Sequence, residues 1–299
     1  MYYFAPADSS GNGRDILNYI DFDTLNHAVV CPLPNCPHTD PKTCYALGIG
    51  NGAATILPVG DYIYWTRIEN DGKTYLYKAN KDGTDRTREA ELPKETWGAE
   101  LVLKDNKLYF VGSDSLFDEK GGINEDVPAY LMRYDFDTKE TEECVKIGEL
   151  YPNMGRMKSG IEGFFDGKIY AYAFSETVAP HYFSYDIESE EVTKLDYAPL
   201  WIQGGYMVIH GPKLLSPDGT EFKFDAPENG FYGYQIVSDK LFTRAYVYDI
   251  PTQKQYENLI TDATVSLLLY KDGRFLIRSR QNNSFKWVDE DKIIGDEIA

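Results

Sequence analysis

The sequence lacks the features that would place the protein in a membrane, on nucleic acid or among helical folds. No segment approaches the ~20 apolar residues that a membrane-spanning helix needs, and no helical apolar period persists for three turns. Only 30 basic residues stand against 48 acidic ones, which leaves a formal charge of −18. Because that charge repels a polyanion and no basic stripe offsets it, nucleic acid is not expected as a partner.

Familiar catalytic motifs and a targeting signal are missing as well. There is no Gly-x-Ser-x-Gly sequence, so an α/β-hydrolase interpretation has no nucleophile. The glycine-rich run from Gly48 to Ala53 lacks a strand before it and a helix after it, and it is interpreted as a connection. Met1 is followed at once by Tyr2-Tyr3-Phe4, which is typical of a strand and not of a signal peptide. The protein is therefore expected in the cytoplasm, or outside it at the cell surface if an export signal has been removed.

Tyrosine is abundant, with 24 residues that fall mostly in short alternating runs. Tyr62-Ile63-Tyr64-Trp65 is one such run. Pleated, half-buried surfaces favour aromatic and β-branched residues in this alternation. The composition therefore predicts an all-β protein with almost no helix.

Two sequence pieces recur along the chain and define a repeat. The first is a strand that ends in a Tyr-Asp turn, at Tyr19-Ile20-Asp21, Tyr134-Asp135, Tyr185-Asp186 and Tyr248-Asp249. The second is a hairpin turn followed by an alternating strand, at Asp105-Asn106, Asp166-Gly167, Ser238-Asp239 and Asp272-Gly273. Together they predict a repeated four-stranded antiparallel meander, which a sandwich or barrel does not produce.

The repeat predicts one β-propeller domain over residues 1–299, most simply with seven blades, while six or eight remain open. Candidate blades begin near Met1, Ala53, Glu100, Glu162, Gln203, Tyr234 and Val265. Seven blades give about 43 residues each, within the ~40–50 residues typical of propeller blades. The blade from Gln203 is short and is expected to lack a fourth strand. The first blade lacks an innermost strand, so the segment Lys292-Ile293-Ile294 is expected to complete it, unless the chain is truncated.

The Tyr-Asp turns resemble the corresponding turns of Kelch and related propellers. The run Leu215-Ser216-Pro217-Asp218-Gly219-Thr220 similarly resembles the Ser-Pro-Asp-Gly turn of TolB-like propellers. Both resemblances imply the fold and carry little information about function.

A cluster of potential metal ligands lies in one short proline-rich segment. Cys31, Cys36, His38 and Cys44 follow the spacing C-x4-C-x-H-x5-C, inside an insertion loop at about residues 31–52. Three thiolates and one imidazole form a complete tetrahedral set for a structural zinc ion, with no open position for catalysis. In an oxidising compartment two of these cysteines could instead form a disulfide, with the third left over or joined to Cys144.

The segment from Tyr19 to Ala46 resembles an uncharacterised group of propeller lipoproteins and surface proteins from Clostridia-like gut bacteria. In that group a similar Cys-x4-Cys-x-His-x5-Cys segment follows an early Tyr-Ile-Asp-x-x-Thr strand. The resemblance implies a bacterial origin and a surface location, but no activity. The lack of a signal peptide is the departure of this sequence from the group.

Residues that enter the innermost strands predict a binding site at one face of the propeller, where the longer loops emerge. The segments around Trp97, Glu100, Ser159-Gly160-Ile161-Glu162 and Trp201-Ile202-Gln203 align, with Tyr232 in a looser fourth copy. Aromatic rings beside carboxylates and amides suit a sugar or a cationic group. Arg156 and Lys158 fall on the same face and suit an anion. The alternative is that these residues have a structural role and bind no ligand. Propeller channels commonly hold polar residues, and tryptophans commonly pack between blades.

These observations favour a non-catalytic binding module, a monomer whose loops bind a protein, peptide or glycan. The alternative is a carbohydrate-active lyase or hydrolase that uses Glu100 and Glu162, since adjacent blades can bring two carboxylates within the ~5–10 Å range that glycoside cleavage requires. A third possibility is a scaffold domain of a larger surface assembly.

Overall fold

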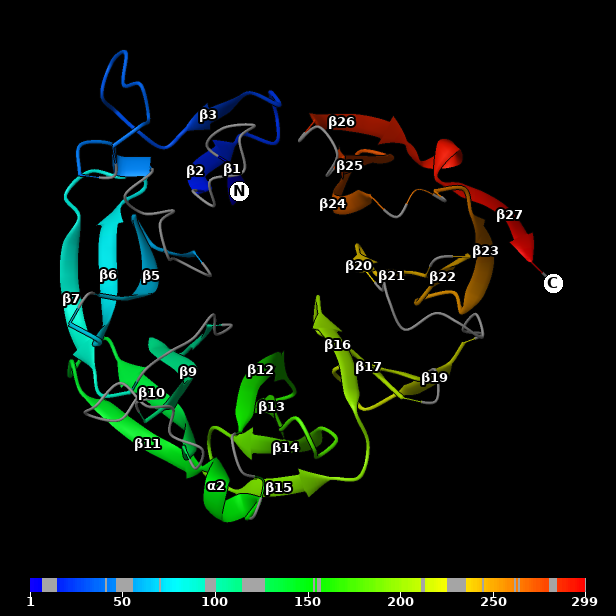
Figure 1. The fold of residues 1–299 in the computed structure, drawn as a ribbon. Helices are drawn as coiled ribbons and strands as arrows, with labels where there is room; N and C mark the ends of the chain where they lie inside the picture. The colour runs from blue at the N-terminus through cyan, green and yellow to red at the C-terminus, as the bar shows by residue number, and fades with distance from the viewer. Residues whose placement is uncertain are drawn as a thin grey trace. The chain divides into compact units, whose positions relative to one another are not determined.

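A computed structural model describes most of the chain, and its secondary structure is almost entirely antiparallel β-sheet (Figure 1). The described residues are 1–6, 15–40, 42–46, 56–69, 71–94, 101–114, 127–152, 154, 157–210, 213–224, 235–243, 245–260, 262, 264–279 and 284–298. The chain divides into two compact units, Met1–Ile161 with Ala171–Lys194 and Glu162–Tyr170 with Leu195–Ala299. The division falls within the fourth of the seven sheets that the described ranges form.

The first three sheets belong to the first unit, and each is a meander of strands that are consecutive in sequence. The first sheet contains β1 (Tyr2–Pro6), β2 (Asp15–Ile20) and β3 (His27–Val29). The second contains β4 (Leu57–Val59), β5 (Tyr62–Ile68), β6 (Thr74–Asn80) and β7 (Thr87–Leu92). The third contains β8 (Val102–Lys104), β9 (Lys107–Ser113), β10 (Ala129–Asp135) and β11 (Thr141–Lys146), followed by the one-turn helix α2 (Ile147–Leu150).

The remaining sheets follow the same plan, with one departure at the C-terminal end. The fourth sheet contains β12 (Lys158–Phe165), β13 (Lys168–Phe174), β14 (His181–Asp186) and β15 (Val192–Leu195). The fifth contains β16 (Pro199–Gln203), β17 (Tyr206–Ile209), β18 (Lys213–Leu215) and β19 (Glu221–Lys223). The sixth contains β20 (Gln235–Val237), β21 (Lys240–Phe242), β22 (Tyr246–Asp249), β23 (Lys254–Asn258) and β27 (Ile294–Ile298), and the seventh contains β24 (Val265–Lys271), β25 (Arg274–Ser279) and β26 (Ser284–Asp289).

The described residues form seven successive antiparallel meanders, most of them four-stranded, which confirm the predicted β-propeller architecture. The sequence-based expectation that the fifth sheet lacks a fourth strand is wrong, because β19 pairs with β18 over three residues. The expectation that the C-terminal segment completes the first sheet is also wrong. After the short helix η1 (Glu290–Lys292), β27 pairs with β23 as a fifth strand of the sixth sheet.

The two recurring turns have the backbone conformations that their residues favour. Asp105 and Asn106 have φ of 50° and 57°, and Asp166 and Gly167 have φ of 46° and 74°, as two-residue hairpins of this type require. At the Tyr-Asp turns the aspartate carboxylate accepts backbone N–H groups two or three residues later. Asp135 Oδ1, for example, accepts from Asp137 N at 2.8 Å and from Thr138 N at 3.1 Å. The hydrogen bonds from these two N–H groups, of which that from Thr138 has the larger effect, hold the pKa of the Asp135 carboxyl below its usual value.

Successive sheets in each unit bury apolar side chains against one another. In the first unit, Leu17 on β2 packs in one cluster with Ile63 and Trp65 on β5. In the second unit, Phe242 on β21 and Phe275 on β25 meet edge to face at 5.3 Å between ring centroids. The alternation of buried and exposed residues in each strand produces these interfaces, because side chains of a strand point alternately to its two faces.

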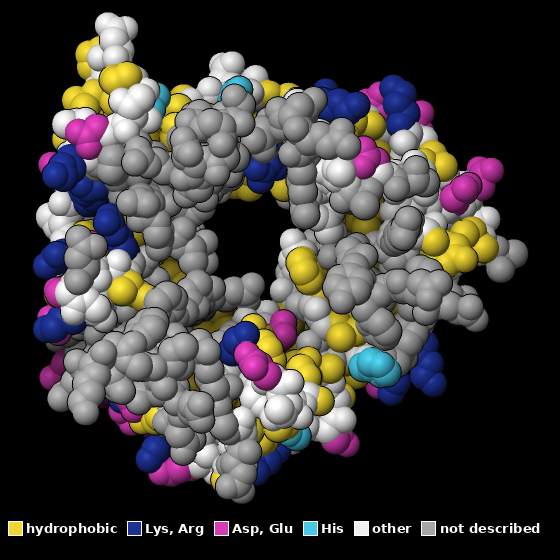
Figure 2. Space-filling model, viewed as in Figure 1, with side chains coloured by type: hydrophobic (Ala, Val, Ile, Leu, Met, Phe, Trp, Pro, Cys, Tyr) yellow, Lys and Arg dark blue, Asp and Glu magenta, His cyan; other side chains and the backbone are white. Residues whose placement is uncertain are grey.

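Charged side chains line the outer strands of the second sheet, where Figure 2 shows Lys and Arg groups at the left of the view. Lys73 Nζ lies 2.6 Å from Glu91 Oε1, and Arg88 Nη2 lies 3.8 Å from Glu69 Oε2. Exposed pairs of this kind contribute only ~0–1 kcal/mol each to stability. Each pair joins one positive and one negative charge, so the pairs add no net charge to this part of the sheet. Among the described residues, no helix is long and apolar enough to cross a membrane.

Candidate metal centre

The four predicted metal ligands come together in the structure. Cys31, Cys36, His38 and Cys44 each offer one ligand atom, and these atoms all lie within 4.8 Å of one another. His38 Nδ1 lies 3.1 Å from Cys44 Sγ. A tetrahedral zinc ion with ordinary Zn–S and Zn–N bonds separates its ligand atoms by roughly 3.3–3.8 Å. The four ligand atoms are therefore close enough that they could hold a metal ion after small shifts, in which His38 Nδ1 and Cys44 Sγ move slightly apart.

The loop reaches this arrangement through tight local turns. The Cys31 N–H donates to Val29 O at 2.8 Å immediately after β3. Asn35 and His38 have φ of 57° and 53°, the left-handed region in which the chain reverses sharply. Asp40 then begins the last turn, since its carbonyl accepts the Cys44 N–H at 2.8 Å. Each ligand thus lies at or next to a turn, which lets fourteen residues surround one point.

The loop is attached to the core of the first unit. Cys44 is 1% exposed and belongs to the same apolar cluster as Leu17, Val30 and Trp65. Gly83, in the turn between β6 and β7, has φ of +87°, and a Cβ there would lie 3.0 Å from Val30 O. A side chain at position 83 would therefore push against Val30, which lies between β3 and the metal loop.

Hydrogen bonds to sulfur favour the thiolate form of Cys31. Burial by itself raises the pKa of this thiol. The N–H groups of Leu33 and Tyr45 and the thiols of Cys36 and Cys44 hydrogen-bond to the sulfur, and their combined effect lowers the Cys31 pKa below its usual value. A thiolate is the form that binds metal.

No disulfide forms among the four cysteines, all of which lie in the described part of the chain. Cys144 lies on β11 in the third sheet, outside the metal loop. Burial raises the pKa of its thiol, which hydrogen-bonds with Tyr185. The disulfide alternative therefore has no counterpart in this structure.

Of the eight residues predicted to bind a ligand, half fall in the described part of the chain. Trp97, Glu100, Arg156 and Tyr232 lie outside the described residues. Lys158 and Glu162 lie on β12, and Trp201 and Gln203 lie on β16. Trp201 is 40% exposed, and its Nε1–H donates to Gln203 Oε1 at 2.8 Å.

Two glutamines, Gln203 of this series and Gln235, connect consecutive sheets in the second unit. Gln203 Oε1 on β16 accepts the Ile236 N–H of β20 at 3.2 Å. Gln235 Oε1 on β20 accepts the Leu267 N–H of β24 at 2.9 Å. The same side-chain-to-backbone bond thus joins the first strand of one sheet to the first strand of the next. These contacts support the structural alternative for Gln203.

Removing one of these inter-sheet bonds is expected to destabilise the second unit. Gln235→Leu leaves the Leu267 N–H without its acceptor in a largely buried strand, which costs about 1–3 kcal/mol. Gln255→Leu, on β23, is the matched control and is expected to change stability by less than about 0.5 kcal/mol. Urea unfolding of both variants measures the difference, and equal effects would contradict the structural role.

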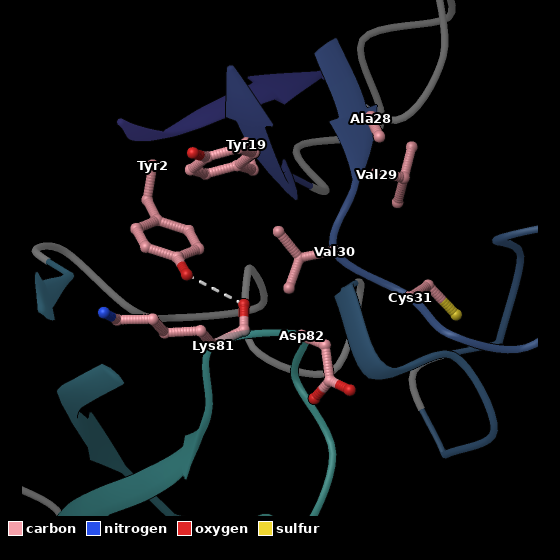
Figure 3. A pocket seen from close by; sticks show the side chains of 8 residues that line it. All are labelled: Tyr2, Tyr19, Ala28, Val29, Val30, Cys31, Lys81 and Asp82. Carbon is pink, nitrogen blue, oxygen red and sulfur yellow. Dashed lines mark hydrogen bonds between the residues drawn. The ribbon is translucent and has the colours of Figure 1, made fainter. Parts of the chain in front are cut away.

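A cavity beside the metal loop was not anticipated from the sequence. It has a volume of about 450 Å³ and is lined by Tyr2, Tyr19, Ala28, Val29, Val30, Cys31, Lys81 and Asp82 (Figure 3). Its residues come from the first sheet and from the turn after β6. Cys31 belongs both to this cavity and to the metal cluster, so the two features share a wall.

The fold and the cluster define a β-propeller that carries a potential metal-binding loop. No protein-family model matches the chain, and no curated protein matches it. Among solved structures, a puromycin hydrolase mutant is 10% identical with a TM-score of 0.57, covering 99% of this chain and 52% of that one. An acylaminoacyl peptidase from Pyrococcus horikoshii is 12% identical with a TM-score of 0.53, covering 93% of this chain and 49% of that one.

TolB from Acinetobacter baumannii is 13% identical with a TM-score of 0.42, covering 95% of this chain and 62% of that one, and a score this low carries no argument. The chain spans about half the length of the hydrolase and the peptidase. At these identities the likeness shows the fold alone. The resemblance to surface proteins of gut bacteria stays a prediction.

Proposed function

We propose that the chain is a non-catalytic binding module, one propeller domain over residues 1–299 whose loops bind a protein, peptide or glycan. One structural zinc ion, held by Cys31, Cys36, His38 and Cys44, fixes the loop after the first sheet. The convergence of these four ligand atoms within 4.8 Å carries the proposal. Four protein ligands fill the coordination of zinc, so the ion stabilises the loop and offers no position for a substrate.

The proposal rests on the effect of a bound metal ion on the conformational entropy of the loop. A long loop loses conformational entropy when it binds a ligand, and a loop already held by a metal loses less. The metal loop also adjoins the cavity through Cys31, so its order bears on a concave surface. No observation in the described part of the chain favours the alternative enzyme, whose residue Glu100 lies outside that part.

Elemental analysis and library binding test the two halves of the proposal. We expect about one zinc per chain in the wild type and in Cys144→Ser, and none in Cys36→Ser or His38→Ala. Immobilised glycan and peptide libraries should yield a ligand that binds the wild type more tightly than Cys36→Ser. Absence of zinc together with fewer than four titratable thiols would show disulfides instead. Turnover of a glycan that is lost in Glu162→Gln would overturn the non-catalytic assignment.

A further inference from the structure

The three cysteines of the metal loop differ in their exposure to solvent. Cys31 and Cys36 are half-buried, whereas Cys44 is 1% exposed. All four residues between the first two cysteines are exposed, namely Pro32, Leu33, Pro34 and Asn35. A small oxidant dissolved in water therefore reaches the sulfurs of Cys31 and Cys36 before it reaches that of Cys44.

The sulfurs of Cys31 and Cys36 are also close to each other. They lie within 4.8 Å, and the Cys36 thiol hydrogen-bonds to the Cys31 sulfur. The backbone turns between them, because the Cys36 N–H donates to Leu33 O at 3.4 Å and Asn35 has φ of 57°. A disulfide bond of ~2.05 Å requires the two sulfurs to approach by less than about 3 Å. Rotation about the Cα–Cβ bonds in an exposed turn allows such a shift.

Cys44 is held in place by contacts that a new bond would break. Its side chain packs in the apolar cluster with Leu17 and Trp65. Its sulfur lies 3.1 Å from His38 Nδ1, and its N–H donates to Asp40 O at 2.8 Å. Drawing this sulfur out of the cluster would leave a void in the core, which costs stability.

The remaining cysteine lies outside the metal loop. Cys144 is on β11 of the third sheet, and its thiol hydrogen-bonds with Tyr185 on β14. Of the four cysteines, Cys31 and Cys36 are therefore the pair that combines access to solvent with proximity.

We infer that the metal loop is a redox switch, in which hydrogen peroxide converts the zinc-bound form into a Cys31–Cys36 disulfide and releases the ion. This inference rests on the proposed zinc-held loop and names its regulation. After oxidation only His38 and Cys44 remain as ligands, too few for a structural zinc site. The disulfide closes the first turn of the loop alone, so residues 37–43 lose the constraint that the ion provides.

The reaction consumes peroxide and protons only. Metal binding requires both sulfurs as thiolates. The Cys31 thiolate attacks one oxygen of the peroxide, the O–O bond breaks, and one proton completes a sulfenic acid and a water. The Cys36 thiolate then attacks the Cys31 sulfur, and the sulfenic oxygen leaves as water with a second proton. In sum, two thiolates, one peroxide and two protons give one disulfide and two waters, with the sulfurs oxidised and the peroxide reduced.

Peroxide treatment of the zinc-loaded full chain, followed by tryptic mapping without reductant, tests the inference. Trypsin places Cys31 and Cys36 on one peptide, residues 15–42, and Cys44 on the next, residues 43–67. We expect release of about one zinc per chain to a chelating dye and loss of two of the four thiols. The first peptide should resist alkylation and lack two hydrogens. Dithiothreitol should restore both thiols and zinc binding.

Two variants accompany the wild type. Cys144→Ser is the matched control, and it should release zinc and form the same disulfide. Cys36→Ser should form no bond within the peptide 15–42, and the sulfenic acid at its Cys31 should instead be trapped by dimedone.

The position of the disulfide decides the outcome. A bond that joins the peptide 15–42 to the peptide 43–67 would overturn the inference, and so would release of zinc without any disulfide. Retention of the zinc and of all four thiols, at a peroxide excess that oxidises free cysteine, would overturn it as well. Each of these results leaves the zinc site and the proposed function standing. A wild-type chain that binds no zinc would overturn both the inference and the metal of the proposed function.

Discussion

Removal of the metal will lower the free energy of unfolding by about 4 kcal/mol when free zinc stands a thousandfold above its dissociation constant. An ion that binds only the folded loop stabilises it by mass action, and the unfolded segment has no preformed site. Replacing Cys44 should produce an additional loss, because this residue is also part of the apolar core. Urea unfolding with zinc and with a chelator measures the change.

Cys144→Ser is the matched control for the metal prediction. This cysteine lies on β11, outside the cluster, so its replacement should leave the zinc-dependent difference intact. Cys36→Ser should remove that difference. A wild-type protein whose stability is the same in zinc and in chelator would contradict a structural metal, whatever its zinc content after purification.

Trp65→Ala will destabilise the protein by about 3–5 kcal/mol, the range expected for deleting a buried aromatic side chain. Trp65 is 1% exposed, stacks on Tyr77 at 5.4 Å between ring centroids, and packs in the cluster that contains Cys44. The cavity left behind adjoins the base of the metal loop. We therefore expect zinc affinity to fall together with stability, as measured by unfolding and by competition with a chelating dye.

Two further tryptophan variants serve as comparisons for Trp65→Ala. Trp201→Ala, at a side chain that is 40% exposed, should cost less than about 1 kcal/mol. Trp65→Phe should cost much less than Trp65→Ala, because Trp65 Nε1 is buried without a hydrogen-bond partner among the described residues and phenylalanine removes that unpaired group. Equal costs for Trp65→Ala and Trp201→Ala would contradict the assigned core.

The sequence was sufficient to predict the architecture because its signals are local. Asp105-Asn106 and Asp166-Gly167 favour the positive φ angles that a tight hairpin needs, and Asp135 satisfies the N–H groups of its own turn. Such residues affect backbone groups only a few positions away, so the turns they form can be predicted without knowledge of the tertiary structure. The metal cluster was predictable for the same reason, since its four ligands lie within fourteen residues.

Features that depend on distant partners were not predictable. Strand β27 lies next to β23 and not in the first sheet, and both pairings satisfy the same short apolar pattern at Ile293-Ile294. The cavity depends on contact between Tyr2 and Lys81, which are 79 positions apart. The role of Gln203 depends on Ile236 in the next sheet. Each of these three features depends on which surfaces of the folded chain come into contact. The local periodicity of the sequence carries no information about such contacts.

The glutamine bonds of the second unit have a consequence for how the number of repeats changes during evolution. Strand β20 donates from Ile236 to the sheet before it and accepts through Gln235 from the sheet after it. One strand thus supplies both the N–H donor for one junction and the side-chain acceptor for the next. A duplicated repeat would enter the array with its donor and acceptor already in place. Deletion of the middle sheet of these three would likewise leave a glutamine acceptor on β16 and an N–H donor on β24, so the two neighbours would retain matching groups.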